Sequence, residues 1–176
     1  GVWTVGTSAD GTASAVGYRV SERFAGGAAN VDAVGRTTSV TGSMTITGLA
    51  VTKLAISADL TRLQSDKDRR DQKMRTSGLE TNRFPTATFT LTQPVDFGAG
   101  STSVVKTTAT GTLALHGQTR PVTVAVEASR NGDRIVVVGN APIVMADYGI
   151  EAPSIPGFVS VSGSGTMEFQ IFFVRA

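Results

Sequence analysis

The chain has 176 residues, a net charge of +2 and 40% hydrophobic residues, a composition that suits one soluble globular domain and excludes an intrinsically disordered chain. Cysteine is absent and histidine occurs once, which excludes disulfides, thiolate sites and a multi-histidine zinc site. The charge excess lies in residues 65–75, where five basic and three acidic residues alternate without an aromatic, and this mixture argues against nucleic-acid binding.

The chain opens directly on a strand-like segment, residues 2–5, without an initiator methionine. We expect this to be a processed start, from which an export signal or an anchor has been removed. The longest apolar runs, residues 135–138 and 171–174, are far shorter than the roughly 18 residues of a membrane-spanning helix. The sequence therefore predicts no helical membrane span.

Apolar and polar residues alternate with period two through most of the chain, which is typical of strands with one buried face. The polar positions are rich in threonine, which favours strands. The alternating or apolar segments are residues 16–20, 40–47, 53–61, 86–91, 108–115, 122–127, 135–138 and 159–173. Turns at Gly48, His116-Gly117 and Asn131-Gly132 predict antiparallel neighbours, and the last of these predicts a type I′ hairpin.

Two local signals interrupt this pattern. The segment between Ser65 and Gly78 predicts the one helix, with Ser65 or Asp66 as its N-cap and Gly78 as its stop. Met74 is its only large apolar residue, so we expect a short, mostly solvated helix across an opening or an edge of the sheet. Near the end of the chain, Gly163-Ser164-Gly165 predicts a bulge in the last strand.

A long antiparallel sheet with one apolar face packs as a sandwich or closes into a barrel. The pattern predicts an all-β protein with about eight antiparallel strands and one short helix; the closed or nearly closed barrel that we expect is chosen over the sandwich by the resemblance described below. A barrel of this size is either filled by its own side chains or holds one small ligand. Periodicity alone leaves both outcomes open.

Four motifs occur together in one order: SDKDRRD at 65–71, FPTATF at 84–89, LALHGQTRPV at 113–122 and DYGI at 147–150. In this combination the sequence resembles the YceI-like family of bacterial proteins. Each motif alone is modest, whereas their joint occurrence is specific. The resemblance covers most of the chain, from about residue 35 to residue 173.

The resemblance implies a fold, a location and a role. The fold would be an extended lipocalin-like barrel over residues 1–176, with a helix near its open end. Members are exported, so we expect a periplasmic, cell-surface or secreted protein. Characterised members hold a long apolar chain, such as a polyisoprenoid, a quinone tail or a fatty amide, and none is an established enzyme. Many carry a histidine in the first long strands, where this chain has residues 16–20, VGYRV, so the resemblance supplies no head-group histidine there.

Inward-facing apolar side chains are expected to line the pore, with Met74 and Leu79 at its mouth. Methionine suits a lumen that accepts variable chains, because its side chain is flexible and polarisable. The other predicted pocket residues are Met44, Ile46, Leu54, Ile56, Phe84, Phe89, Leu91, Leu113, Met167, Phe169 and Ile171. Trp3 is expected to plug one end of the barrel rather than to contact a ligand.

Three polar residues are candidate head-group contacts, and each has a structural alternative. Arg70 suits a phosphate, or it pairs with neighbouring aspartates. His116 contacts a head group, or it is a turn histidine bonded to the backbone. Tyr148 closes one end of the pore, or it belongs to a turn that starts at Asp147.

The leading hypothesis is non-covalent binding and carriage of a long-tailed amphiphile, such as a polyisoprenoid or an isoprenoid quinone, with release at a membrane or a partner protein. It requires no catalysis, metal or cofactor, and we expect a monomer or a homodimer. Two alternatives stay open. One is a structural or protein-interaction module with a filled barrel core; the other is an enzyme that uses His116, although the chain has no GxSxG nucleophile elbow.

Overall fold

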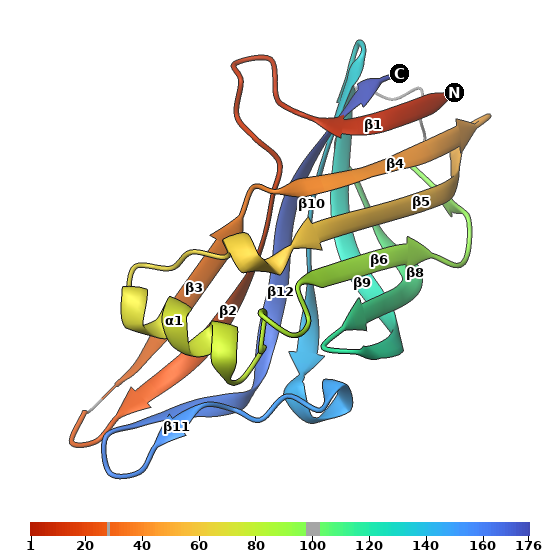
Figure 1. The fold of residues 1–176 in the computed structure, drawn as a ribbon. Coiled ribbons are helices and arrows are strands. Elements are labelled where there is room, and N and C mark those ends of the chain that lie inside the picture. The colour runs from red at the N-terminus through yellow and green to blue at the C-terminus, as the bar shows by residue number, and fades with distance from the viewer. Residues whose placement is uncertain (28, 98–102) are drawn as a thin grey trace.

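The computed structural model describes residues 1–27, 29–97 and 103–176, whose twelve strands form one antiparallel sheet (Figure 1). The strands are β1 (Val2–Gly6), β2 (Ala15–Phe24), β3 (Asn30–Thr37), β4 (Val40–Thr47), β5 (Ala50–Asp59), β6 (Thr86–Leu91), β7 (Val95–Asp96), β8 (Val105–Leu115), β9 (Gln118–Asn131), β10 (Arg134–Val144), β11 (Ser154–Ile155) and β12 (Val159–Arg175). The helix α1 (Asp68–Thr76) and two short 3-10 turns, η1 (Leu60–Arg62) and η2 (Met145–Tyr148), complete the described elements. No helix in these ranges combines the length and the apolar character needed to cross a bilayer.

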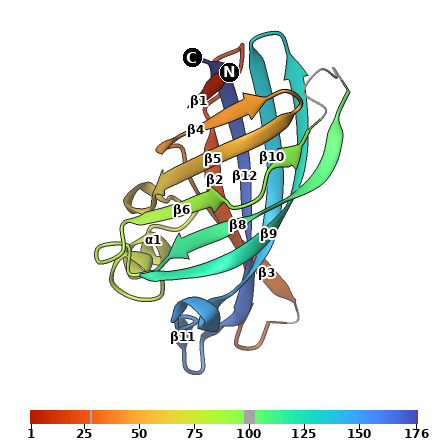
Figure 2. The same cartoon turned by 90° about the vertical axis from the view of Figure 1, so that its right-hand side faces the viewer.

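Eight of the strands close a ring. Their order is β1-β4-β5-β6-β8-β9-β10-β12, and β12 pairs back with β1 (Figure 2). β2 and β3 extend the sheet beyond this ring. The predicted all-β antiparallel barrel of about eight strands with one short helix is therefore confirmed.

The longest strand, β12, joins the ring to its extension. β12 pairs with β10 from Ser164 to Val174, and its other edge pairs first with β2 and then with β1. Ser14 bridges the break between β1 and β2, because its hydroxyl donates to the Gly6 carbonyl at 2.8 Å and accepts from the Phe172 amide at 2.9 Å. The register of β12 against β2 shifts between Val161 and Gly165, where the glycines predicted a bulge.

One long strand, β3, was not predicted. Its buried positions are Ala33, Gly35 and Thr37, which are too small or too polar to produce an apolar alternation. This small inner face leaves room for the side chains of β2, which pairs with it.

Of two predicted hairpin turns, the one at Asn131-Gly132 is displaced and the one at His116-Gly117 is confirmed. Asn131 pairs with Arg134, so the loop residues are 132 and 133, and the predicted type I′ turn centred on Asn131-Gly132 is wrong. The two-residue loop between β8 and β9 has positive φ at both His116 (52°) and Gly117 (74°), which is the backbone requirement of a type I′ turn.

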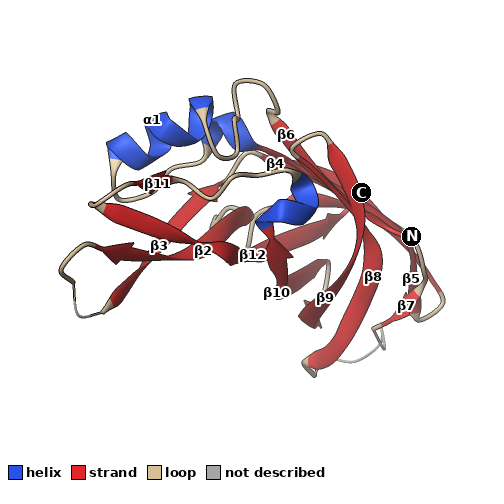
Figure 3. Ribbon diagram, turned by 90° about the horizontal axis from the view of Figure 1, so that it is seen from below, coloured by secondary structure: helices blue, strands red, loops and turns tan. Residues whose placement is uncertain are grey.

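Helix α1 lies beside β2 and β3 (Figures 1 and 3). Its N-cap is Lys67, which makes no side-chain cap hydrogen bond, so the predicted cap at Ser65 or Asp66 is wrong. The Ser65 hydroxyl instead donates to Asp71 at 2.7 Å, and Gly78 follows the helix with φ of 66°. No residue of α1 is fully buried, in agreement with a mostly solvated helix.

The end of the barrel that carries both chain termini is closed by side chains. Trp3 is 3% exposed and packs there with Met44, Ile171 and Phe173. The guanidinium of Arg130 lies 5.1 Å from the centre of the Trp3 ring. Trp3 therefore fills this end, as its apolar bulk predicted.

Candidate functional site

The helix end of the barrel holds a cavity of about 370 Å³, a size within the range of small-molecule sites. A second cavity of about 90 Å³ lies among side chains of the ring strands. The two share four lining residues: Val16, Ala87, Leu113 and Met167. They are therefore neighbouring chambers, which we call the outer and the inner chamber of one lumen.

Most of the predicted pocket residues line these chambers. The outer chamber is lined by Met74, Leu79, Leu113 and Met167. The inner chamber is lined by Met44, Leu54, Ile56, Phe89, Leu91, Leu113, Met167, Phe169 and Ile171. Ile46 lines neither chamber but borders a third, smaller cavity of about 30 Å³, which adjoins the inner chamber and shares Met44, Val51, Phe97 and Val137 with it. Phe84 lines neither chamber and packs against the His116 ring, with 4.3 Å between ring centroids.

Glycines on the inner face explain why aromatic rings do not fill the lumen. Tyr18 pairs across strands with Gly35, and Phe169 pairs with Gly139. A Cβ atom at Gly35 would come within 2.3 Å of the Tyr18 ring, and one at Gly139 within 2.6 Å of the Phe169 ring. Each ring therefore occupies the space above a glycine in the neighbouring strand and lies close to the wall, which leaves the centre of the barrel open.

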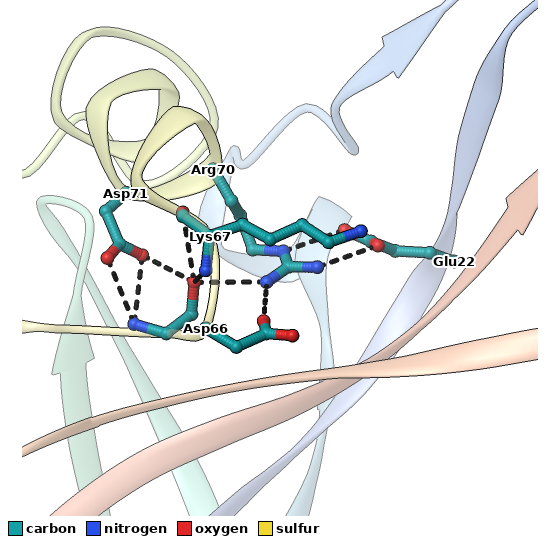
Figure 4. Close-up of polar contacts among 6 residues, drawn as sticks. Glu22, Asp66, Lys67, Arg70 and Asp71 are labelled. Carbon is teal, nitrogen blue, oxygen red and sulfur yellow. Dashed lines mark hydrogen bonds and ion pairs between the residues drawn. The ribbon is translucent and has the colours of Figure 1, made fainter.

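A buried ion pair stands beside the outer chamber and ties α1 to β2 (Figure 4). Arg70 donates from Nε and Nη2 to the two carboxylate oxygens of Glu22, both at 2.9 Å, and the two side chains are only 13% and 10% exposed. Arg70 Nη1 also donates to Ser65 at 3.0 Å and to Asp66 at 2.6 Å. These hydrogen bonds, chiefly those to Glu22, hold the pKa of Arg70 above its ordinary value.

The sequence suggested aspartates as partners of Arg70 but missed Glu22. Asp66 is such a partner, whereas Glu22 lies 48 residues away on another element. The sequence did contain a signal for this pair, because Glu22 is a carboxylate on a strand that otherwise presents apolar residues to the core. Because Arg70 is engaged by protein acceptors, its first role in this structure is to fix the helix against the sheet.

Tyr18 is a second lumen residue that the sequence-based list omitted. It lines the outer chamber, and its hydroxyl is buried without a hydrogen-bond partner among the described residues. Burial raises the pKa of the phenol to about 12, although the nearby Arg70 acts in the opposite direction. The alternation of residues 16–20 already placed Tyr18 on the apolar face, so its polar atom could have been noticed.

The rim of the outer chamber combines cations with exposed aromatic surface. Lys67, Arg69 and Lys73 line it together with Phe24 and Phe158. Phe158 is 63% exposed and meets Phe24 edge-on, and the Lys67 amine lies 5.1 Å from the centre of the Phe24 ring. The entrance is therefore amphipathic, whereas the inner chamber is lined by apolar residues alone.

His116 and Tyr148 lie next to each other but outside the lining of either chamber. His116 Nδ1 lies 2.9 Å from the Tyr148 carbonyl, and Nε2 lies 2.8 Å from a carboxylate oxygen of Glu80. Both imidazole nitrogens therefore face acceptors within the protein, and the residue sits in a turn. Tyr148 is 4% exposed, packs with Leu113 and Ile150, and has its phenol pKa raised by burial.

Within residues 1–27, 29–97 and 103–176, no three histidine or acidic side chains come together as a metal-binding group. The polar side chains that line the outer chamber are Tyr18, Glu22, Arg70, Ser154 and Thr166, together with the cations Lys67, Arg69 and Lys73. This arrangement provides apolar surface, hydrogen bonds and charge. It is suited to holding a molecule that is mostly hydrocarbon.

Comparison with solved structures finds the same fold. A polyisoprenoid-binding domain from Saccharophagus degradans, implicated in plant cell wall breakdown, superposes with a TM-score of 0.76 and 21% identity over 99% of this chain and 98% of that one. BcnA of Burkholderia cenocepacia superposes with a TM-score of 0.64 and 16% identity, over 88% of this chain and 95% of that one. At these identities the likeness shows the fold.

Sequence comparison gives the family. A UPF0312 protein of Vibrio vulnificus is 31% identical over 120 residues, which are 64% of this chain and 61% of the relative. The alignment thus spans about three fifths of that relative's length. The model of the YceI-like domain matches residues 8–173. On this match, the chain belongs to the YceI-like family.

Proposed function

We propose that the protein binds one amphiphile with a long apolar tail, such as a polyisoprenoid, an isoprenoid quinone or a similar lipid, and carries it without covalent chemistry. The observation that carries this proposal is that an amphipathic outer chamber adjoins a wholly apolar inner chamber, with Val16, Ala87, Leu113 and Met167 lining both. The description of the Saccharophagus domain as polyisoprenoid-binding supports the same class of ligand.

The driving force is the removal of hydrocarbon from water. Each 100 Å² of tail surface that leaves water for the apolar lumen contributes about 2.5 kcal/mol before the costs of association. The inner chamber is bounded by residues such as Phe89, Phe169 and Ile171, which have no polar side-chain atoms. It therefore favours the tail, and the polar end of the ligand would stay in the outer chamber.

Loading and release would take place at the helix end. The exposed Phe158 and the cations Lys67 and Arg69 lie around the outer chamber, and such a mixture suits transient contact with a lipid headgroup layer or a partner protein. The opposite end is occupied by the Trp3 cluster. We accordingly place exchange at one end only, in an exported protein acting as a monomer or a homodimer.

The two alternative functions have less support. A structural module with a filled core does not account for the two chambers. An enzyme would need His116, the chain's single histidine, but both of its ring nitrogens lie against Tyr148 and Glu80. A carrier that performs no reaction needs neither a filled core nor a free histidine.

Lipid extraction of the purified protein, followed by mass spectrometry, tests the proposal. Ala87 borders both chambers, so Ala87→Trp would place an indole where the tail passes between them. Thr90→Trp is the matched control, because Thr90 lies on the same strand, β6, and is exposed. We expect wild type and Thr90→Trp to yield a long-chain lipid or to bind added menaquinone, and Ala87→Trp to lose most of it.

The proposal fails if folded wild-type protein yields no long-chain lipid and also does not bind added polyprenol or menaquinone. It fails equally if Ala87→Trp, shown by circular dichroism to be folded, retains the lipid as well as Thr90→Trp does.

A further inference from the structure

The Tyr18 hydroxyl is a buried polar atom in the wall of the outer chamber. Its position is set by the sheet, because the ring lies over Gly35 of the paired strand, where any Cβ atom would collide with it. The ring also packs against the cluster formed by Ala58, Leu60 and Leu63. Tyr18 is therefore held in place by packing and not by its own hydroxyl.

The charged groups near Tyr18 are committed to each other. The two oxygens of Glu22 each accept a hydrogen bond from Arg70, and Arg70 Nη1 donates to Ser65 and Asp66. The Ser65 hydroxyl lies near the phenol, but it donates to Asp71 and accepts from Arg70 and the Lys67 amide. The phenol itself has no partner in hydrogen-bonding geometry among the described residues. With a pKa of about 12, raised mainly by burial, the phenol keeps its proton at neutral pH and is available as a donor.

An unsatisfied buried hydroxyl is unfavourable, and buried polar groups in native proteins nearly always have a partner. Here the partner must come from the chamber itself, either as an ordered water molecule or as an atom of the bound ligand. The charged groups next to Tyr18 are already hydrogen-bonded to each other, and the rest of the wall is mostly apolar, so a water molecule would find few free partners. A ligand oxygen fits this position better.

We propose that Tyr18 is a head-group-binding residue, whose hydroxyl donates a hydrogen bond to a carbonyl or hydroxyl oxygen of the ligand beside the Arg70–Glu22 pair. This inference rests on the proposed function and narrows it, because it requires a long-chain alcohol, ketone or quinone and not a plain hydrocarbon. It also fixes the orientation of the ligand, with its oxygen in the outer chamber and its tail in the inner one.

The test compares two probes that share one branched carbon skeleton, the alcohol phytol and the hydrocarbon phytane. Their dissociation constants are measured by displacement of a fluorescent apolar dye from wild type, Tyr18→Phe and Tyr148→Phe. Tyr148 is the chain's other tyrosine and lines neither chamber, so it is the matched control. We expect Tyr18→Phe to weaken phytol binding about five- to tenfold, the loss of one net hydrogen bond, and to leave phytane binding unchanged.

The stability of the unliganded protein provides an independent readout. Removing an unsatisfied hydroxyl should leave the urea midpoint of Tyr18→Phe unchanged or raise it, whereas loss of a structural hydrogen bond would lower it. Both results together support the inference.

Equal weakening of phytol and phytane by Tyr18→Phe would overturn the inference, because it would indicate lost packing. No change for either probe would also overturn it, because the head group would then lie elsewhere or Tyr18 would be hydrated. If wild type bound neither probe, nor menaquinone, the proposed function would fall together with this inference. If it bound both and Tyr18→Phe made no difference, only this inference would fall.

Discussion

The two ends of the barrel are built from the same alternation of apolar and polar residues, but one is filled by side chains and the other contains a cavity. At the end with the termini, Trp3 and Phe173 meet in a cluster and are 3% and 2% exposed. Farther from the termini, Tyr18 in the wall of the outer chamber and Phe169 in the wall of the inner chamber lie over glycines in the neighbouring strands, and both chambers stay open. The comparison teaches that a glycine opposite a ring lets the ring lie close to the wall, as at Gly35 and Gly139, and so leaves space inside this barrel.

The ends also differ in how polar groups are used. Apolar packing closes the terminal end, with the Arg130 guanidinium over the Trp3 ring. The helix end relies on the Arg70–Glu22 pair to hold α1 against β2, because α1 contributes no fully buried residue. We therefore expect the terminal end to contribute more to the free energy of unfolding and the helix end to make the contacts with the ligand.

The largest expected effect separates the two ends by stability. Trp3→Ala should lower the free energy of unfolding by about 3–5 kcal/mol, because it empties a packed site. Met74→Ala, in the half-buried helix wall, should cost only about 1 kcal/mol. Urea unfolding followed by circular dichroism measures both. Equal losses for the two variants would contradict the assignment of stability to the terminal end.

A smaller effect is expected from the ion pair that holds α1. Glu22→Ala leaves Arg70 buried without its main partner and should cost roughly 3 kcal/mol. The matched control is Glu127→Ala, which removes an ion pair of the same 2.9 Å length between side chains that are 74% and 48% exposed, and which should cost less than about 1 kcal/mol. The same urea experiment gives both values.

Amide hydrogen exchange would show which elements Glu22→Ala destabilises. Faster exchange of the α1 amides in Glu22→Ala, with β1 and β4 unaffected, would confirm that the pair secures the helix end alone. Unchanged α1 exchange would show that the helix is held by other contacts.

Much of the fold was predictable because alternation records which face of a strand is buried. It predicted the residues of β4, β6 and β12 and the number of long strands. It left sandwich and barrel open, and the choice of a barrel came from the family resemblance. β3 escaped because Ala33, Gly35 and Thr37 form its buried face. A strand whose inner side is small leaves no apolar signal, although it creates the space that Tyr18 occupies.

The candidate site was predictable in its hydrocarbon part and not in its polar part. Period-two alternation identifies inward-facing apolar residues whether they fill the core or line a cavity, so it predicted most of the residues that line the two chambers. The polar contacts depend on pairings that join distant segments, as with Glu22 and Arg70. His116 was singled out as a rare residue type, but the structure places it in a turn against Tyr148 and Glu80.

The most direct test of the account is the position of a bound tail. A crystal structure of the protein with a long-chain alcohol that carries bromine on its terminal carbon would locate that carbon by anomalous scattering. The account predicts a bromine peak in the inner chamber among Phe89, Phe169 and Ile171, with the alcohol oxygen near Tyr18. A peak at the rim beside Phe158, or on the outside of the barrel, would contradict it.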